Sequence, residues 1–202
     1  MQRYFVSGIG TEIGKTIVSS VLVEKLKADY WKPVQSGDLE NSDTDKVKRL
    51  ISNTSSRFHA ETYRLTQPFS PHKSARLDGI SINLDAFRIP DTQNHLVIEG
   101  AGGLMVPLND RNLMIDLIRK LDVEVILVSR HYLGSINHTL LSVEALRQRG
   151  IRLKGLIISG DRDPDSEAAI VKIGKVDVLG CVPRLPEINA ENIAAAARTL
   201  DV

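Results

Sequence analysis

The sequence predicts an α/β fold in which a single domain, residues 1–202, contains a mostly parallel sheet flanked by helices. The chain has 202 residues, and domains commonly contain roughly 100–200 residues. Short apolar, β-branched runs alternate with amphipathic helical patterns, an order typical of parallel sheets with right-handed crossovers. Two of the runs, residues 123–129 and 154–159, are hydrophobic almost throughout, as expected of strands covered by helices on both faces.

In the first half of the chain, the predicted elements begin with a strand at residues 3–8 (RYFVSG). A helix follows over residues 15–28, where apolar side chains recur at spacings of three and four. A second strand is predicted at residues 30–34 (YWKPV), and a loop enters a helix near Asp43. Residues 53–92 contain three prolines, so we expect long loops with one short helix there.

In the second half, a strand at residues 95–103 (HLVIEGAGG) leads into a glycine loop. After the strand at 123–129, a helix is predicted with Ser135 as its N-cap and Gly150 at its end. The remaining predicted elements are strands at residues 154–159 and 176–182 and a helix at residues 190–200. In sheets of this kind, ligands bind beyond the carboxyl ends of the strands.

Composition argues against several classes of protein and site. The formal net charge is +1, so nothing indicates the electrostatic footprint of a surface that binds nucleic acid or an anionic membrane. No run approaches the roughly 18 apolar residues of a membrane span, and the N-terminus has no room for a signal peptide, so we expect a cytoplasmic protein. A single cysteine excludes an internal disulfide, and the five histidines show no zinc-ligand spacing.

Residues 6–16, VSGIGTEIGKT, look like a phosphate-binding loop with unusual spacing. The standard pattern has a glycine five positions before Gly14, where this chain has Ile9, so the loop is one residue longer. A loop between a strand and a helix N-terminus offers unpaired N–H groups and the positive end of the helix dipole, which bind phosphate. Lys15 adds a cation and Thr16 a hydroxyl able to coordinate Mg²⁺. The loop is therefore either a nucleotide site in a P-loop NTPase-like fold or an incidental turn.

Two carboxylates and a second lysine are further candidates for this site. Glu99 follows an apolar strand and is expected at its carboxyl end, where an exposed acid can approach Mg²⁺. Asp43, with Asp45 as its neighbouring alternative, is either a metal ligand or a helix N-cap, and the local sequence favours the N-cap. Lys32, beside Pro33, is either a second cation aimed at the phosphates or a solvated lysine on an edge strand.

Seven motifs follow one another along the chain: GTEIGKT, KPVQSG, NSD, SPH, EGAGG, LGSINH and VPRL. In this order and spacing they resemble those of the dethiobiotin synthetase family, in which the longer phosphate loop is usual. The similarity covers nearly the whole chain. It implies that one amine of 7,8-diaminopelargonate (7,8-diaminononanoate) takes up CO2. ATP then phosphorylates the carbamate, and the second amine closes a cyclic urea, which leaves ADP and phosphate as products in biotin biosynthesis.

The resemblance also implies roles for individual residues. Lys32 and Lys15 would be the catalytic residues, and Thr16, Asp43 and Glu99 would hold Mg²⁺. The implied ATP-binding residues are Glu12, Ile13, Gly14, Lys15, Thr16, Ile17, Asp43, Glu99, Gly100, Ala101, Gly102, Pro183, Arg184, Leu185 and Glu191. The implied substrate-binding residues are Thr11, Ser36, Ser70, Pro71, Gly134, Ser135, Ile136 and Asn137.

The family is homodimeric, which implies that residues 134–137 hold the carboxylate tail of a diamine bound in the other subunit. A helix that begins at Ser135 gives an independent physical reason, because a helix N-terminus favours a carboxylate. The chain departs from the family at Ser159-Gly160, where Asn-Asp is common. A serine cannot make the paired donor and acceptor contact of an amide to a base, so base selectivity is left open. The choice between Glu187 and Glu191 at the ribose is also open.

Three other classes of protein share parts of this pattern. A partition- or switch-type ATPase would carry an extra lysine early in the loop, where this chain has Gly10. The ATP-using half of a cobyrinate-type amidotransferase would need an attached glutaminase with a nucleophilic cysteine. A plain nucleotide-binding module would bind ATP without catalysis. Phosphate release that depends on the diamine would separate a synthetase from all three.

Overall fold

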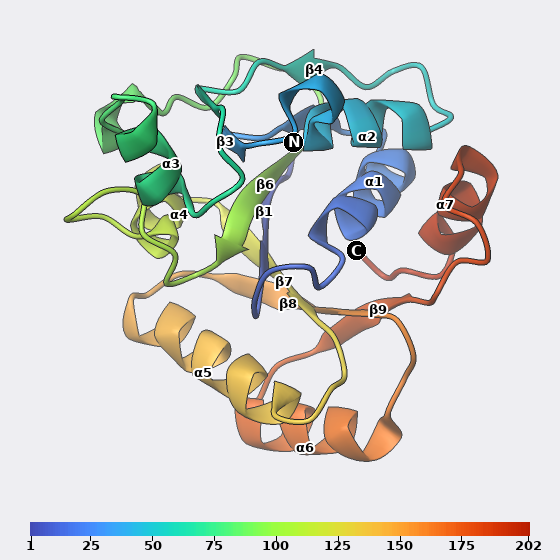
Figure 1. Ribbon diagram of the computed structural model, residues 1–202. Helices are drawn as coiled ribbons and strands as arrows, with labels where there is room; N and C mark the ends of the chain where they lie inside the picture. The colour runs from blue at the N-terminus through green and yellow to red at the C-terminus, as the bar shows by residue number, and fades with distance from the viewer.

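Seven parallel strands form the central sheet of the computed structural model, which describes residues 1–202 (Figure 1). Their order across the sheet is β4-β2-β6-β1-β7-β8-β9, and β3 and β5 form a separate two-stranded parallel sheet. The strands are β1 (Arg3–Gly8), β2 (Asp29–Trp31), β3 (Val34–Ser36), β4 (Phe58–His59), β5 (Tyr63–Leu65), β6 (Leu96–Gly103), β7 (Glu124–Ser129), β8 (Leu153–Ser159) and β9 (Val178–Val182). The predicted α/β architecture is confirmed.

Helices follow most of the strands along the chain, and the sequence predicts part of this alternation. They are α1 (Lys15–Leu26), α2 (Asp43–Leu50), α3 (Pro71–Leu77), α4 (Met114–Leu121), α5 (Ser135–Gln148), α6 (Pro164–Gly174) and α7 (Ala190–Ala197). Two short 3-10 helices, η1 (Leu39–Asn41) and η2 (Leu84–Ala86), lie in the connections. The helices α1 and α7 end a few residues earlier than predicted, and the sequence analysis did not resolve α4 and α6 as separate elements.

Helices cover the sheet on both faces, and the strand sequences explain why. Phe5 and Ile98 belong to a core cluster that includes apolar residues of α4, α5 and α6. Tyr4 and Val97, each next to one of them in sequence, belong to a second cluster with residues of α1, α2 and α7. Figure 1 shows these two groups of helices on opposite sides of the sheet. Because both faces are buried, β7 and β8 are hydrophobic almost throughout, as predicted.

The predicted strand at residues 30–34 is wrong as a single element. Strand β2 ends at Trp31, and the chain passes through Lys32 and Pro33 before β3 begins in the other sheet. Proline has no N–H to donate to a strand ladder, which explains the break. The region of residues 53–92 contains the predicted short helix α3, and it also contains two short strands, β4 and β5, that the sequence analysis missed.

The carboxyl ends of β1, β2 and β6 converge because these three strands are neighbours in the sheet. Strand β1 leads into the phosphate-loop sequence, β2 leads into Lys32, and β6 carries Glu99. The fold therefore brings together three segments that are far apart in the sequence, at the carboxyl ends of the strands, where ligands bind in open α/β sheets.

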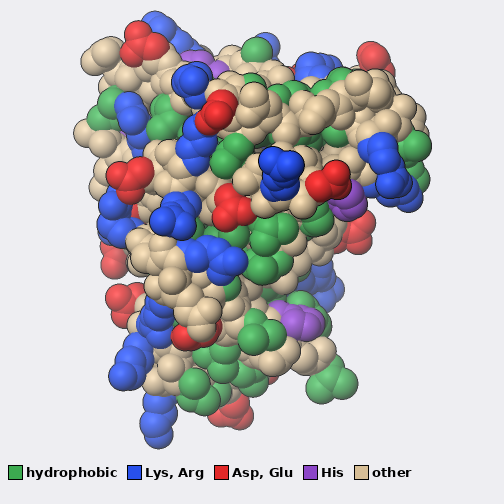
Figure 2. All heavy atoms as spheres, turned by 90° about the vertical axis from the view of Figure 1, so that its left-hand side faces the viewer, with side chains coloured by type: hydrophobic (Ala, Val, Ile, Leu, Met, Phe, Trp, Pro, Cys, Tyr) green, Lys and Arg blue, Asp and Glu red, His purple; other side chains and the backbone are tan.

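The surface carries mixed charge on the face seen in Figure 2. Lysine and arginine side chains are interspersed there with acidic ones, with apolar side chains between them. Among the helices, none has both the length and the apolar character that a bilayer crossing needs.

Candidate functional site

The loop between β1 and α1, called the phosphate loop (residues 9–14) below, has a backbone that requires glycine. Gly14 has φ 91°, in the left-handed region, which glycine adopts without steric cost. A Cβ at Gly14 would also lie 2.2 Å from Ser159 Oγ of β8. Gly14 is the N-cap of α1, so the first N–H groups of that helix face the strand ends.

Lys15 folds back over the phosphate loop. Its Nζ donates a hydrogen bond to the Gly10 carbonyl oxygen at 2.9 Å, and the residue is only 8% exposed. Burial lowers the pKa of Lys15 to about 8, with the Glu99 and Asp43 carboxylates opposing this and the Lys32 ammonium adding to it. Lys15 is thus a buried cation with one hydrogen-bond partner, the Gly10 carbonyl oxygen.

Glu99 lies within β6 and accepts three hydrogen bonds. Thr16 Oγ1 and Lys32 Nζ donate to its Oε1 at 2.9 and 3.0 Å, and the Tyr30 hydroxyl donates to its Oε2 at 2.9 Å. The expectation of an exposed acid at the carboxyl end of a strand is wrong, because β6 continues to Gly103 and Glu99 is 1% exposed. Burial and the Glu99 carboxylate raise the pKa of Tyr30 well above its usual value, so its hydroxyl stays protonated.

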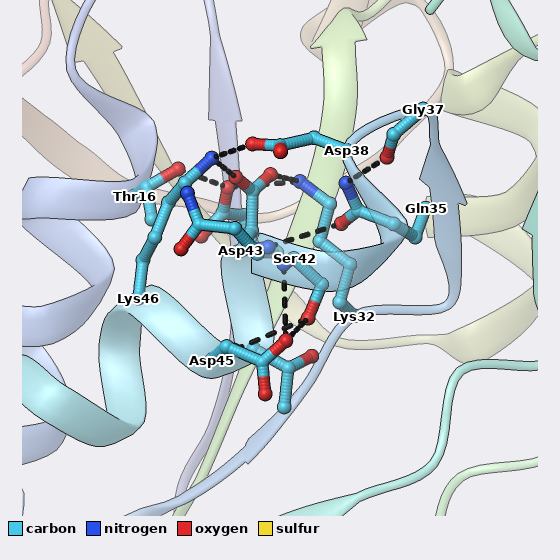
Figure 3. Close-up of polar contacts among 12 residues, drawn as sticks. Thr16, Lys32, Gln35, Gly37, Asp38, Ser42, Asp43, Asp45 and Lys46 are labelled. Atoms are coloured by element: carbon cyan, nitrogen blue, oxygen red, sulfur yellow. Dashed lines mark hydrogen bonds and ion pairs between the residues drawn. The ribbon is translucent and has the colours of Figure 1, made fainter. Parts of the chain in front are cut away.

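Lys32 is held between two carboxylates, as Figure 3 shows for its approach to Asp43. Its Nζ forms ion pairs with Asp43 and Glu99, and the residue is 4% exposed. Burial alone would lower the pKa of Lys32, but the Glu99 and Asp43 carboxylates outweigh burial and raise it. The alternative of a solvated lysine on an edge strand is therefore wrong.

Asp43 does not cap helix α2. Ser42 is the N-cap and forms a capping box with Asp45, which leaves the Asp43 carboxylate free to contact Lys32 (Figure 3). The N-cap interpretation of Asp43 is thus wrong, and Asp45 is occupied by the cap. Burial would raise the pKa of Asp43, but Lys32 and Lys46 together outweigh burial and lower it. Lys46 also approaches Asp43, at 3.5 Å.

A cavity of about 550 Å³ opens above this cluster, a size typical of small-ligand sites. Most of the residues expected at the site line it. They are Thr11, Glu12, Gly14, Lys15, Thr16, Ile17, Lys32, Ser36, Asp43, Ser70, Pro71, Glu99, Ala101 and Gly102. Of the two expected residues nearby that do not line it, Ile13 packs in the core, and a Cβ at Gly100 would lie 2.7 Å from the Phe5 ring.

The other expected residues lie outside the cavity. Pro183, Arg184 and Glu191 are exposed and Leu185 is half-buried, with Arg184 paired to Asp161 at 2.9 Å. Residues 134–137 lie at the start of α5. The predicted N-cap there is wrong, because Gly134 at φ 99° is the N-cap and Ser135 is the first helical residue.

The structure also brings to this site several residues that the sequence did not indicate. Gln35 is buried, accepts a hydrogen bond from the Asp43 N–H at 3.2 Å and donates to the Gly37 carbonyl oxygen. Phe69 and Val106 give the cavity apolar walls. Tyr30, on the neighbouring strand β2, donates a hydrogen bond to Glu99.

The donors at the centre of the site are all oxygens. Thr16 Oγ1 donates to Glu99, and Lys32 Nζ links Glu99 to Asp43, so these three oxygen-bearing side chains lie near one another, and hard oxygen ligands are those that Mg²⁺ prefers. The protein has no cluster of three or more His, Cys, Asp or Glu side chains that could hold a metal ion alone. A magnesium ion beside Thr16, Asp43 and Glu99 therefore fits the residues if phosphate oxygens and waters complete its coordination.

Known proteins resemble this chain both in fold and in sequence. A family model described as an AAA domain matches residues 2–192. The solved structure of the septum site-determining protein MinD from Pyrococcus horikoshii, complexed with Mg-ADP, superposes with a TM-score of 0.61 over 96% of this chain and 86% of that chain. At 16% identity, this likeness shows a shared P-loop NTPase fold.

Curated relatives are much closer in sequence. A protein of Christiangramia forsetii named ATP-dependent dethiobiotin synthetase BioD is 59% identical over 185 residues, which cover 92% of this chain and 89% of the relative. A protein of the same name from Cytophaga hutchinsonii is 48% identical over 198 residues, which cover 98% and 96%. The chain therefore belongs to the ATP-dependent dethiobiotin synthetase family.

Proposed function

We propose that this protein is a dethiobiotin synthase, an ATP-dependent ligase that converts 7,8-diaminopelargonate and CO2 to dethiobiotin, with ADP and phosphate as the other products. One observation carries the proposal: Lys15, Lys32, Thr16, Asp43 and Glu99 all line the same cavity of about 550 Å³, a volume typical of small-ligand sites. A reaction that joins a diamine, CO2 and ATP needs such a joint site. We further propose that the enzyme works in the cytoplasm, where ATP is available and its single cysteine stays reduced.

The nucleotide half of the site would use the phosphate loop. Its main-chain N–H groups and Lys15 would bind the phosphates, and Thr16, Asp43 and Glu99 would hold Mg²⁺. When bound, this ion would neutralise charge on the phosphate oxygens. The base and ribose would lie toward residues 183–185, with Glu187 or Glu191 at the ribose. The Ser159 hydroxyl lies close to Gly14, and a serine cannot make the paired donor and acceptor contact of an amide to a base. We therefore expect weak discrimination among bases.

The diamine half would use the opposite wall of the cavity. Ser36 lines the cavity and its hydroxyl has no hydrogen-bond partner in the protein, so it is available to an amine. Thr11, Ser70 and Pro71 would lie along the same ligand. Phe69 and Val106 would pack against its aliphatic chain.

The chemistry would proceed by three bond-forming steps. One amine nitrogen attacks CO2 and loses a proton to give a carbamate. A carbamate oxygen then attacks the γ-phosphorus, the bond to ADP breaks, and a carbamic-phosphoric anhydride forms. The second amine attacks the carbonyl carbon, phosphate leaves with the C–O bond electrons, and a proton is lost as the cyclic urea closes. Lys32 would stabilise the charge that develops on the carbamate and γ-phosphate, and alignment of the reactants can supply roughly 7–11 kcal/mol of the barrier.

The tail of the diamine would reach a second subunit. Residues 134–137 do not line the cavity of their own chain, and neighbouring Leu133 is fully exposed, so this edge can face another copy. In a homodimer, the N-terminus of α5 would meet the carboxylate of a diamine in the partner's cavity.

This arrangement predicts a selective effect of Asn137→Ala. Because Asn137 would contact only the carboxylate tail, we expect the KM for the diamine to rise by about 10-fold, in line with the loss of a hydrogen bond to a charged group. The KM for ATP should change little. Steady-state kinetics with each substrate varied in turn test this, and an equal rise in both KM values would argue against a tail-binding role.

The low pKa of Lys15 predicts proton uptake when nucleotide binds. At pH 8.5, above the pKa of about 8, most Lys15 side chains in the free protein are neutral. Nearby phosphates favour the charged form, so ADP should draw a proton from the buffer. Titration calorimetry in two buffers of different ionisation enthalpy measures this uptake. Lys15→Arg, which stays charged, should abolish it, whereas equal uptake in that variant would assign the proton to another group.

The activity itself is tested by phosphate release. We expect ATP cleavage that requires both the diamine and bicarbonate, with a cyclic urea product detected by mass spectrometry. Equal phosphate release without the diamine would instead indicate a switch-type ATPase, a class whose fold is shared by MinD. Nucleotide binding without any release would indicate a plain binding module.

A further inference from the structure

Tyr30 contacts the centre of the site although the proposed reaction assigns it no role. Its side chain is fully buried, and its hydroxyl donates its hydrogen bond to Glu99 Oε2 at 2.9 Å. The other carboxylate oxygen, Oε1, accepts from both Thr16 and Lys32. Tyr30 is therefore the side chain that donates a hydrogen bond to Oε2 of Glu99.

The strand register explains how the tyrosine reaches this oxygen. In the parallel pairing of β2 with β6, Tyr30 lies opposite Val97. Glu99 is two residues farther along β6 and so points to the same face of the sheet. Two residues of a strand span about 6.6 Å, a distance that a phenol ring lying along the strand bridges and a serine or threonine does not. The centroids of the Phe58 and Tyr30 rings lie 6.1 Å apart, and this packing helps to fix the direction of the Tyr30 ring.

The three donors to Glu99 differ in what they do during the proposed reaction. Thr16 would turn its hydroxyl toward Mg²⁺, and Lys32 would contact the carbamate and γ-phosphate. Both of these contacts to Oε1 would then be weakened or lost. Tyr30 is fully buried in the core and does not line the cavity, so its bond to Oε2 would persist.

We propose that Tyr30 is a positioning residue that fixes the Glu99 carboxylate, so that this carboxylate would keep its orientation for holding Mg²⁺ when Thr16 and Lys32 change partners. This inference rests on the proposed function, because it assumes that Glu99 faces a metal–nucleotide complex. Hydrogen-bonded partners of metal ligands commonly set the orientation of those ligands.

The test compares Tyr30→Phe with a matched control, Tyr4→Phe. Tyr4 lies on β1 opposite the same Val97, on the other side from Tyr30, and it belongs to the same core cluster. Its hydroxyl is buried without a partner. Each variant loses one buried hydroxyl and keeps its ring, so both should fold. ADP affinity is measured by calorimetry with and without Mg²⁺, and the apparent Mg²⁺ constant is measured in the steady state.

We expect Tyr30→Phe to lose about 10-fold in the Mg²⁺-dependent gain in ADP affinity, with metal-free ADP affinity unchanged. Tyr4→Phe should match the unaltered protein in both measurements. The positioning role would be overturned if Mg²⁺ increased the ADP affinity of Tyr30→Phe as much as that of the unaltered protein. It would also be overturned if Tyr30→Phe lost ADP affinity equally with and without Mg²⁺. Either result would leave the proposed function intact. If Mg²⁺ does not increase the ADP affinity of the unaltered protein, the proposed metal site is wrong, and the inference about Tyr30 is wrong with it.

Discussion

Lys32→Ala should lower kcat by about 10²–10³-fold, as the loss of a preorganised group that stabilises transition-state charge does in other enzymes. Lys32 would contact the carbamate and γ-phosphate, whereas Lys15 and the phosphate loop would still bind nucleotide. The affinity for ADP should therefore change little. Steady-state kinetics and calorimetry on the same preparations separate these two effects.

The same variant should also be less stable without a metal ion. The structure shows Lys32 as the cation between two carboxylates. Removing one partner of a buried ion pair commonly costs about 3–5 kcal/mol. Mg²⁺ with ADP should restore part of this loss, because the ion would neutralise the same carboxylates. Thermal unfolding with and without Mg-ADP measures the difference.

Lys46→Ala is the matched control for this experiment. Lys46 also approaches the Asp43 carboxylate, at 3.5 Å, but its closer partner is Asp38 at 2.7 Å and it does not line the cavity. Its kcat should stay within a few-fold of that of the unaltered protein. If Lys32→Ala and Lys46→Ala reduced kcat equally, the effect would come from Asp43 and not from a cation at the reacting atoms.

Glu99→Gln should cause the second-largest loss of activity, after Lys32→Ala. The amide keeps the shape of the side chain but removes the charge that faces Thr16 and Lys32, and its NH2 group cannot accept their hydrogen bonds. We expect the Mg²⁺ affinity of the ADP complex to fall by about 10–100-fold and kcat to fall with it. Calorimetry with Mg²⁺ and ADP measures the first effect, and steady-state kinetics measure the second.

Glu61→Gln serves as the control for Glu99→Gln. Glu61 is a half-buried acid that accepts hydrogen bonds from Thr44 and Arg64 and does not line the cavity. Its replacement should leave Mg²⁺ affinity unchanged. Normal Mg²⁺ dependence in Glu99→Gln would remove Glu99 from the metal site.

The sequence predicted the fold well because its strongest signals are local. Buried parallel strands require continuous apolar runs, and these were visible in β7 and β8. The end of β2 was missed because a proline within an apolar run is compatible with an edge strand as well as with a break. The short strands β4 and β5 carry too few residues for a periodic pattern.

The candidate site was harder to predict, because its geometry depends on contacts between distant segments. Asp43 could not be told from an N-cap, since that choice depends on whether Ser42 takes the capping position. The burial of Glu99 follows from the pairing of β2 with β6 and from the packing of α1 against β6, which no local pattern records. Tyr30 was missed for the same reason: its role depends on the register between β2 and β6. The motifs that resemble the family located the segments, and the sheet order explains why those segments meet.

A structure with a non-hydrolysable ATP analogue, Mg²⁺ and the diamine bound would test the central claim most directly. We predict that the Nζ atoms of Lys15 and Lys32 both lie within hydrogen-bond distance of the terminal phosphate, with an amine of the diamine beside Lys32. A structure in which the two ammonium groups point to separate ligands, or in which Lys32 remains between Asp43 and Glu99, would contradict the proposed mechanism.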